Sequence, residues 1–63
     1  MQTENLWQEA ITLVAEYMNG GPNWKRGLAV DLAARIATAE HRDAGDVFAD
    51  IENQAEEVTA RVL

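Results

Sequence analysis

The sequence predicts an all-α fold, a small three-helix bundle, from three observations. Apolar residues recur at helical spacing along three stretches. Two breaks separate these stretches, a strong one at residues 19–23, where two glycines and a proline stop a helix, and a weaker one at residues 41–43. No stretch alternates apolar and polar residues long enough to form a strand. With 63 residues, the chain has room for one helical domain, residues 1–63.

The first helix is predicted over residues 5–19, where Asn5 and Gln8 fit a capping-box-like start. Its apolar residues form two adjacent rows with 4-3-4 spacing: Leu6, Ala10, Leu13 and Tyr17, and Trp7, Ile11, Val14 and Met18. Together these rows cover roughly 160° of the helix circumference. An arc this wide exceeds what a single neighbouring helix covers.

The second helix is predicted over residues 24–41, with Asn23 as its N-cap. It carries a row of large residues and, beside it, a row of small ones: Leu28, Leu32, Ile36 and Ala39, and Ala29, Ala33 and Ala37. Small side chains at this spacing let another helix approach closely. The second helix therefore has two apolar faces.

The third helix is predicted over residues 44–62, with Asp43 as its N-cap. Its apolar residues follow a heptad pattern that we predict to be a self-association seam: Phe48, Ile51, Ala55, Val58 and Val62. A chain of about 60 residues buries only about 60% of its unfolded surface. We therefore expect a homodimer to complete the core, with a monomeric bundle or a different protein partner as alternatives.

Composition argues against most catalytic chemistry. The chain has no cysteine, which excludes disulfides and thiolate-bound metal clusters. It has one histidine, His41, which lacks the second histidine of a typical helical metal site, so a solvated position at a helix end is expected. No glycine-rich phosphate motif is present. We expect a non-enzymatic protein without a cofactor or a bound metal.

Charge is unevenly distributed along the acidic chain, whose net charge is -6. The positive feature is Trp24, Lys25 and Arg26, which could bind an anion at the start of the second helix. The negative feature is an acidic row on the third helix, formed by Asp46, Asp50 and Glu57. A regular row of carboxylates is suited to a protein with a basic surface, although it could equally be an ordinary solvated face.

No apolar run approaches the roughly 20 residues of a membrane span, and no signal-peptide pattern follows Met1. We therefore expect a cytoplasmic protein that does not bind membranes. Size and acidity are typical of phage or mobile-element accessory proteins, which often occupy the surface of a host protein.

The predicted function is a small protein-binding module, regulatory or inhibitory in role. Tryptophan and arginine dominate the energetics of protein interfaces, so the expected contact residues include both tryptophans. The full set is Trp7, Trp24, Lys25 and Arg26, together with the acidic row. Two alternatives remain open. One is a nucleic-acid-binding regulator that uses the start of the second helix, and the other is a self-associating structural subunit.

Overall fold

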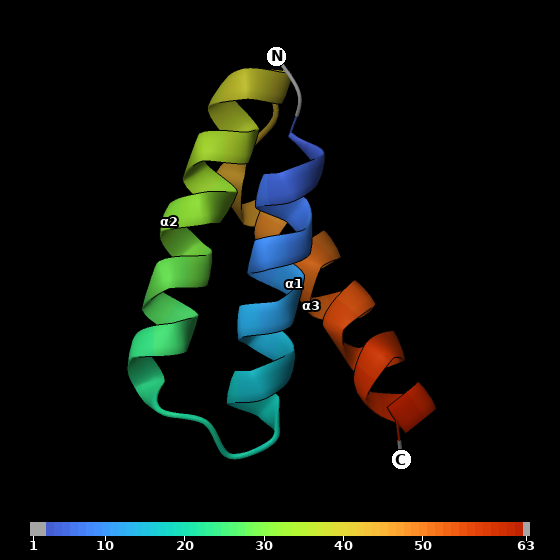
Figure 1. Ribbon diagram of the computed structural model, residues 1–63. Coiled ribbons are helices and arrows are strands. Elements are labelled where there is room, and N and C mark those ends of the chain that lie inside the picture. Colours follow the sequence, from blue (N-terminus) through green and yellow to red (C-terminus); the bar gives the residue numbers. More distant parts are fainter. Residues whose placement is uncertain (1–2, 63) are drawn as a thin grey trace.

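The computed structural model describes residues 3–62, apart from the side chain of Val62. It contains three α-helices, α1 (Glu4–Met18), α2 (Asn23–Glu40) and α3 (Ala44–Val62), and no strand within the described range. In Figure 1, α1 and α2 run side by side in opposite directions, and α3 crosses behind them. Each helix packs against both others. The prediction of an all-α three-helix bundle is confirmed, with helix limits within one residue of those expected.

The N-caps agree with the sequence prediction at one helix of three. Asp43 caps α3 as predicted, because its Oδ1 atom accepts hydrogen bonds from the backbone N–H of Gly45 and of Asp46, at 2.7 and 3.3 Å. The other two predicted caps are wrong. Asn23 is the first residue of α2, preceded by Pro22, and α1 begins at Glu4 rather than after Asn5. Neither of these two starts has a side-chain cap.

The turn between α1 and α2 depends on both of its glycines. Gly20 adopts a left-handed conformation, with φ of 94°, as is common directly after a helix. Gly21 donates its N–H to the carbonyl of Glu16 at 2.9 Å, which completes a Schellman motif. A Cβ atom at Gly21 would lie 2.6 Å from the same carbonyl oxygen, so no larger residue fits without a shift.

The turn between α2 and α3 reverses the chain without a glycine. His41 takes the left-handed position, with φ of 56°, and Arg42 donates its N–H to the carbonyl of Ala37 at 2.9 Å. Histidine is one of the few non-glycine residues that adopt this conformation with some frequency. The sequence break at residues 41–43 is therefore a short helix-capping turn.

The core lies along the line where the three helices meet. Its largest fully buried side chains are Val14, Ile36, Val47 and Ile51. The small-residue row of α2, Ala29, Ala33 and Ala37, also points inward and is at most 5% exposed. Because alanine side chains are short, α2 can approach its neighbours closely along this row.

The wide apolar arc of α1 is covered within the chain. Its rows face α2 on one side and α3 on the other, so that Ala10 and Val14 are buried and most of the flanking residues are half-buried. The width of this arc, which suggested a second chain, is explained by two intramolecular neighbours. These intramolecular neighbours do not explain the second apolar face predicted for α2.

Candidate protein-binding surface

The solvent side of α2 exposes large apolar side chains. We call it the outer face of α2 and define it by seven exposed residues, Trp24, Gly27, Leu28, Asp31, Ala34, Arg35 and Thr38. On a helix with about 100° per residue these positions share an arc of roughly 120°. A helix that exposes large apolar residues on its solvent side, in addition to its apolar core side, is often covered there by another molecule.

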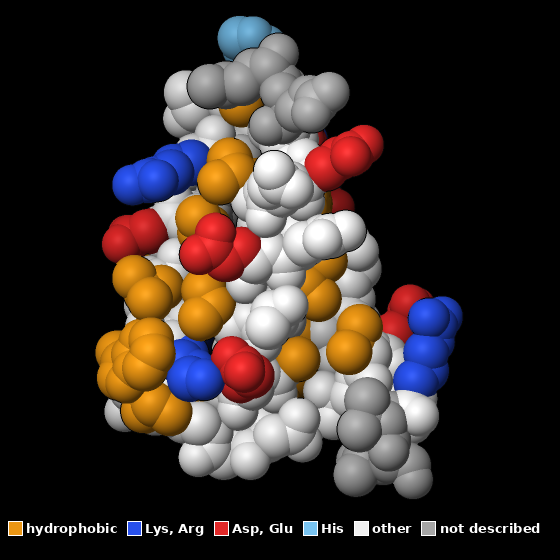
Figure 2. Space-filling model, in the orientation of Figure 1, with side chains coloured by type: hydrophobic (Ala, Val, Ile, Leu, Met, Phe, Trp, Pro, Cys, Tyr) orange, Lys and Arg blue, Asp and Glu red, His pale blue; other side chains and the backbone are white. Residues whose placement is uncertain are grey.

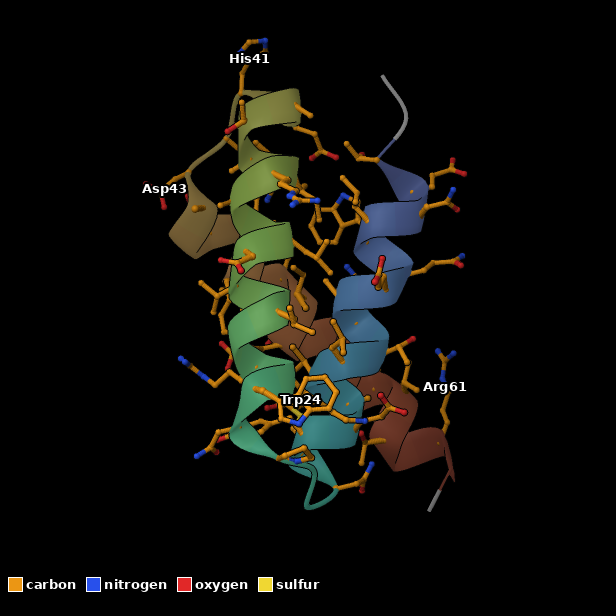
Figure 3. The ribbon with its side chains drawn as sticks, turned by 60° about the vertical axis from the view of Figure 1, so that its left-hand side comes forward. Trp24, His41, Asp43 and Arg61 are labelled. Atoms are coloured by element: carbon orange, nitrogen blue, oxygen red, sulfur yellow. The ribbon has the colours of Figure 1, made fainter. Side chains whose placement is uncertain are left out.

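Trp24 and Leu28 are the most exposed large apolar side chains of the described residues, with 60% and 46% of their surface accessible. They lie one turn apart at the start of α2, where Figure 2 shows hydrophobic side chains gathered at the lower left of the molecule. Figure 3 places Trp24 at the end of α2 opposite to His41. The Nζ atom of Lys25 lies 5.5 Å from the centre of the Trp24 ring, a cation–π distance.

The exposure of Leu28 separates it from Leu32 and Ile36, with which the sequence pattern placed it in one row of large apolar residues. The structure buries Leu32 and Ile36 and leaves Leu28 nearly half in water. The reason is that the alanine row sets the centre of the buried side, so Leu28 falls at its margin. Exposed Leu28 is a candidate contact residue that the sequence analysis missed.

A shallow hollow of about 580 Å³ lies at the second half of the outer face, on the side towards Leu6 of α1. Its lining is mostly apolar and comes from Leu6, Ala34, Arg35, Thr38 and Ala39. A smaller hollow of about 230 Å³ follows along the groove between α1 and α2, where Asp31 and Glu9 also contribute. Leu28 also lines this smaller hollow. The outer face therefore has two exposed large apolar side chains, Trp24 and Leu28, in the first half of α2, and an apolar hollow in the second half.

The two cations at the start of α2 are engaged within the chain. Lys25 forms an ion pair with Glu16, with an Nζ–Oε1 distance of 3.0 Å. The guanidinium of Arg26 lies 5.3 Å from the centre of the Phe48 ring, so it stacks on α3. The predicted cluster of Trp24, Lys25 and Arg26 is brought together in space, but its charges already have partners.

The three carboxylates of the acidic row on α3 differ in whether they have a partner among the described residues. Asp46 and Glu57 are exposed, and neither forms an ion pair with any described residue. Asp50 instead accepts a hydrogen bond from Arg42, with an Nη2–Oδ2 distance of 2.6 Å. This contact raises the pKa of Arg42 and fastens the α2–α3 turn to α3. Asp50 therefore has a structural contact in addition to its predicted surface role.

Trp7 belongs to a polar network at the end of the bundle where α1 begins and α2 ends. Its indole N–H donates to Oε2 of Glu40 at 2.9 Å, and the Thr3 hydroxyl donates to the same oxygen at 2.6 Å. The guanidinium of Arg42 covers the Trp7 ring at 5.7 Å. Hydrogen bonds from Thr3 and Trp7, with a smaller contribution from Arg42, hold the pKa of Glu40 below its ordinary value. Trp7 is thus half-buried and fully engaged inside the chain.

The predicted self-association seam faces mainly inward. Ile51 and Ala55 are 0% exposed in the core, so they have no surface to offer to a second copy. Phe48 is half-buried beneath Arg26, whereas Val58 is 42% exposed. The Val62 side chain lies outside the described residues. The seam therefore serves the intramolecular core at its first two turns.

Three further observations concern other kinds of site. Residues 3–62 hold no group of three or more metal-ligating side chains in a suitable arrangement. None of the described helices is long and apolar enough to cross a membrane. His41 projects from the end of α2, as Figure 3 shows, and is exposed.

The chain matches no protein-family model, and comparison with curated proteins and solved structures finds no significant match.

Proposed function

We propose that this protein is a non-enzymatic protein-binding module, regulatory or inhibitory in role, which binds through the outer face of α2. The observation that carries the proposal is the exposure of Trp24 and Leu28 beside an apolar hollow. An exposed tryptophan flanked by a leucine, with polar groups around them, is typical of the centre of a protein interface. Exposed apolar residues gathered on one face mark interaction sites more often than isolated ones do.

The surroundings of Trp24 favour a protein partner over a nucleic acid. Nucleic-acid affinity depends on cations that neutralise phosphates. At the start of α2 one cation is paired with Glu16 and the other is stacked on Phe48, in a chain with a net charge of -6. Binding a phosphate backbone there would require breaking these contacts and overcoming the overall repulsion.

A second surface supports a partner with a basic region. Asp46 and Glu57 are exposed on α3 without ion pairs to described residues, and Arg61 is the only cation of that helix. The carboxylates can therefore attract a positively charged surface and speed its association, more at low salt than at high salt. This flank lies on a different helix from the outer face of α2, so both surfaces can be used at once.

The experiment compares three purified, tagged variants as bait for proteins from the source cell. Trp24→Asp alters the outer face of α2, Val58→Asp makes the same kind of change at an exposed apolar residue of α3, and the unchanged chain is the reference. We expect a discrete partner that resists nuclease, remains with Val58→Asp and is lost with Trp24→Asp.

Direct titration of that purified partner then measures the contribution of the indole. Trp24→Ala is expected to weaken binding by about 30-fold or more, as for an interface hot spot. Retention of the partner by Trp24→Asp would contradict the proposal. Capture of nucleic acid that depends on Lys25 and Arg26 would support the nucleic-acid alternative instead.

A further inference from the structure

We propose that the partner covering the outer face of α2 is a second copy of this chain, packed antiparallel through a two-fold axis at the level of Ala33. This inference rests on the proposed function, since it names the protein that this face binds. The proposed interface is not the self-association seam predicted on α3. Ile51 and Ala55 of that seam are fully buried and have no surface for a second copy.

The outer face carries two charges that no other described residue pairs with. Asp31 and Arg35 are the only charged residues of the outer face, and both are exposed. Neither forms an ion pair with another residue of the described chain. They lie one turn apart, about 6 Å along the helix axis. The outer face thus presents one unpaired negative charge and one unpaired positive charge.

Two-fold symmetry makes these two charges complementary to themselves. In an antiparallel pair of α2 helices centred on position 33, residue 31 of each copy faces residue 35 of the other. Asp31 then meets the Arg35 of its partner copy, and the same contact forms again on the other side of the axis. Interfaces between identical chains are commonly isologous, so that each contact occurs twice.

The exposed leucine of one copy also meets an apolar hollow of the other. The same axis places residue 28 of one copy opposite residue 38 of the other, since both lie five residues from position 33. Leu28 is 46% exposed at the edge of the smaller hollow, and Thr38 lines the apolar hollow of about 580 Å³. Each copy therefore inserts its exposed leucine into the hollow of its partner copy. The charge pair and the apolar pair require the same axis, although they involve different residues.

Small residues on the outer face allow the two copies of α2 to come close together. Gly27 and Ala34 are the small residues of the outer face, and nothing lies within 4 Å of a Cβ atom built on Gly27. Small residues at a helix–helix contact reduce the distance between the axes, which is usually about 8–10 Å. Dimerisation would also cover the second apolar side of α2, which the monomer leaves in water.

The test uses charge reversal on the intact chain. Asp31→Arg and Arg35→Asp each place like charges opposite one another in a homodimer. A mixture of the two variants restores opposite charges at both contacts, since the variant with two arginines meets the variant with two aspartates. Mixing cannot relieve repulsion within one helix, so recovery on mixing identifies a contact between copies.

Sedimentation equilibrium and native mass spectrometry measure the species between about 1 µM and about 500 µM. We expect the unchanged chain to reach a mass of twice 7.0 kDa. Each single variant should dimerise about 10- to 100-fold more weakly, and the equimolar mixture should form the mixed dimer. Glu56→Arg and Arg61→Asp carry the same changes in charge at exposed residues of α3 and should dimerise as the unchanged chain does. Far-UV circular dichroism checks that every variant is folded.

Two results would overturn the inference. One is an unchanged chain that stays monomeric throughout this range. The other is a dimer that both single variants form as readily as the α3 controls, which would place its interface elsewhere. These results leave the proposed function separately testable, because a monomer that still captures another protein through Trp24 contradicts only the identity of the partner. A chain that binds neither its own copy nor another protein at this face contradicts both.

Discussion

The contrast between Ile36 and Leu28 gives the most direct test of the packing of α2. The two residues share the predicted large-residue row, but Ile36 is 0% exposed and Leu28 is 46% exposed. Truncating a fully buried isoleucine to alanine typically costs about 2–5 kcal/mol, because burial is lost and a cavity remains. A domain of this size rarely has more than about 3–5 kcal/mol of stability from its core. Ile36→Ala should therefore leave the chain barely folded or unfolded.

Leu28→Ala should cost far less. Complete burial of a leucine is worth about 1.5–3 kcal/mol, and about half of this side chain is already in water, so a loss of about 1 kcal/mol is expected. The higher helix propensity of alanine recovers a few tenths of a kcal/mol. Urea unfolding followed by circular dichroism, at a protein concentration low enough to keep the chain monomeric, measures both values.

An equal loss for the two variants, or a loss below about 1 kcal/mol for Ile36→Ala, would refute this orientation of α2. Repeating the titration at high protein concentration adds a second comparison. If the chain dimerises through the outer face of α2, its unfolding midpoint rises with concentration, and Leu28→Ala reduces that rise.

Three other predictions concern different regions of the chain. Trp24→Phe leaves only half-buried Trp7, so its fluorescence should be blue-shifted and resist acrylamide, whereas Trp7→Phe leaves an exposed indole that acrylamide quenches. The lowered pKa of Glu40 stabilises the fold above the pKa of its unfolded carboxyl, about 4.3, and this contribution is lost as pH falls through the lower folded value. Glu40→Gln should therefore flatten the acid side of the stability profile. Gly27→Ala should stabilise α2 by about 0.5–1 kcal/mol, because its surroundings are open. Gly21→Ala should destabilise by about 1–3 kcal/mol, because its Cβ would meet a backbone carbonyl.

Each of these predictions has a clear contrary result. Equal quenching of the two tryptophan variants would contradict the contrast in exposure. A Glu40→Gln profile parallel to that of the unchanged chain, from about pH 6 to about pH 3, would exclude Glu40 as a source of acid sensitivity. Thermal unfolding compares the two glycine variants, and a more stable Gly21→Ala would show that the α1–α2 turn has room for a side chain.

The sequence predicted the helices well because local physics decides where a helix begins and ends. Gly20, Gly21 and Pro22 interrupt helical structure whatever surrounds them, and Asp43 caps a helix through its own neighbouring backbone. One of the two misplaced starts, that of α1, involves a tertiary contact. The Thr3 hydroxyl, which precedes α1, is oriented towards Glu40 on another helix, to which it donates a hydrogen bond. A local pattern contains no information about that contact.

The candidate surface was predicted less completely than the helices. Trp24 was named from its residue type, and the structure leaves it exposed. Trp7 has the same residue type, yet Glu40, located 33 positions further along the chain, accepts its N–H within the bundle. Composition could not separate these two tryptophans, because their difference lies in which side of α1 or α2 each occupies after packing.

Residue type and spacing alone thus predicted the number of helices, their limits, the acidity of α3 and the two apolar sides of α2. Which of those two sides is covered emerged only when the three helices were packed together. The alanine row lets α2 approach α1 and α3 most closely, so that row turns inward and carries Leu28, Asp31 and Arg35 to the solvent side. Burial depends on the shape of all three helices together, and the spacing of residues along one helix cannot specify it.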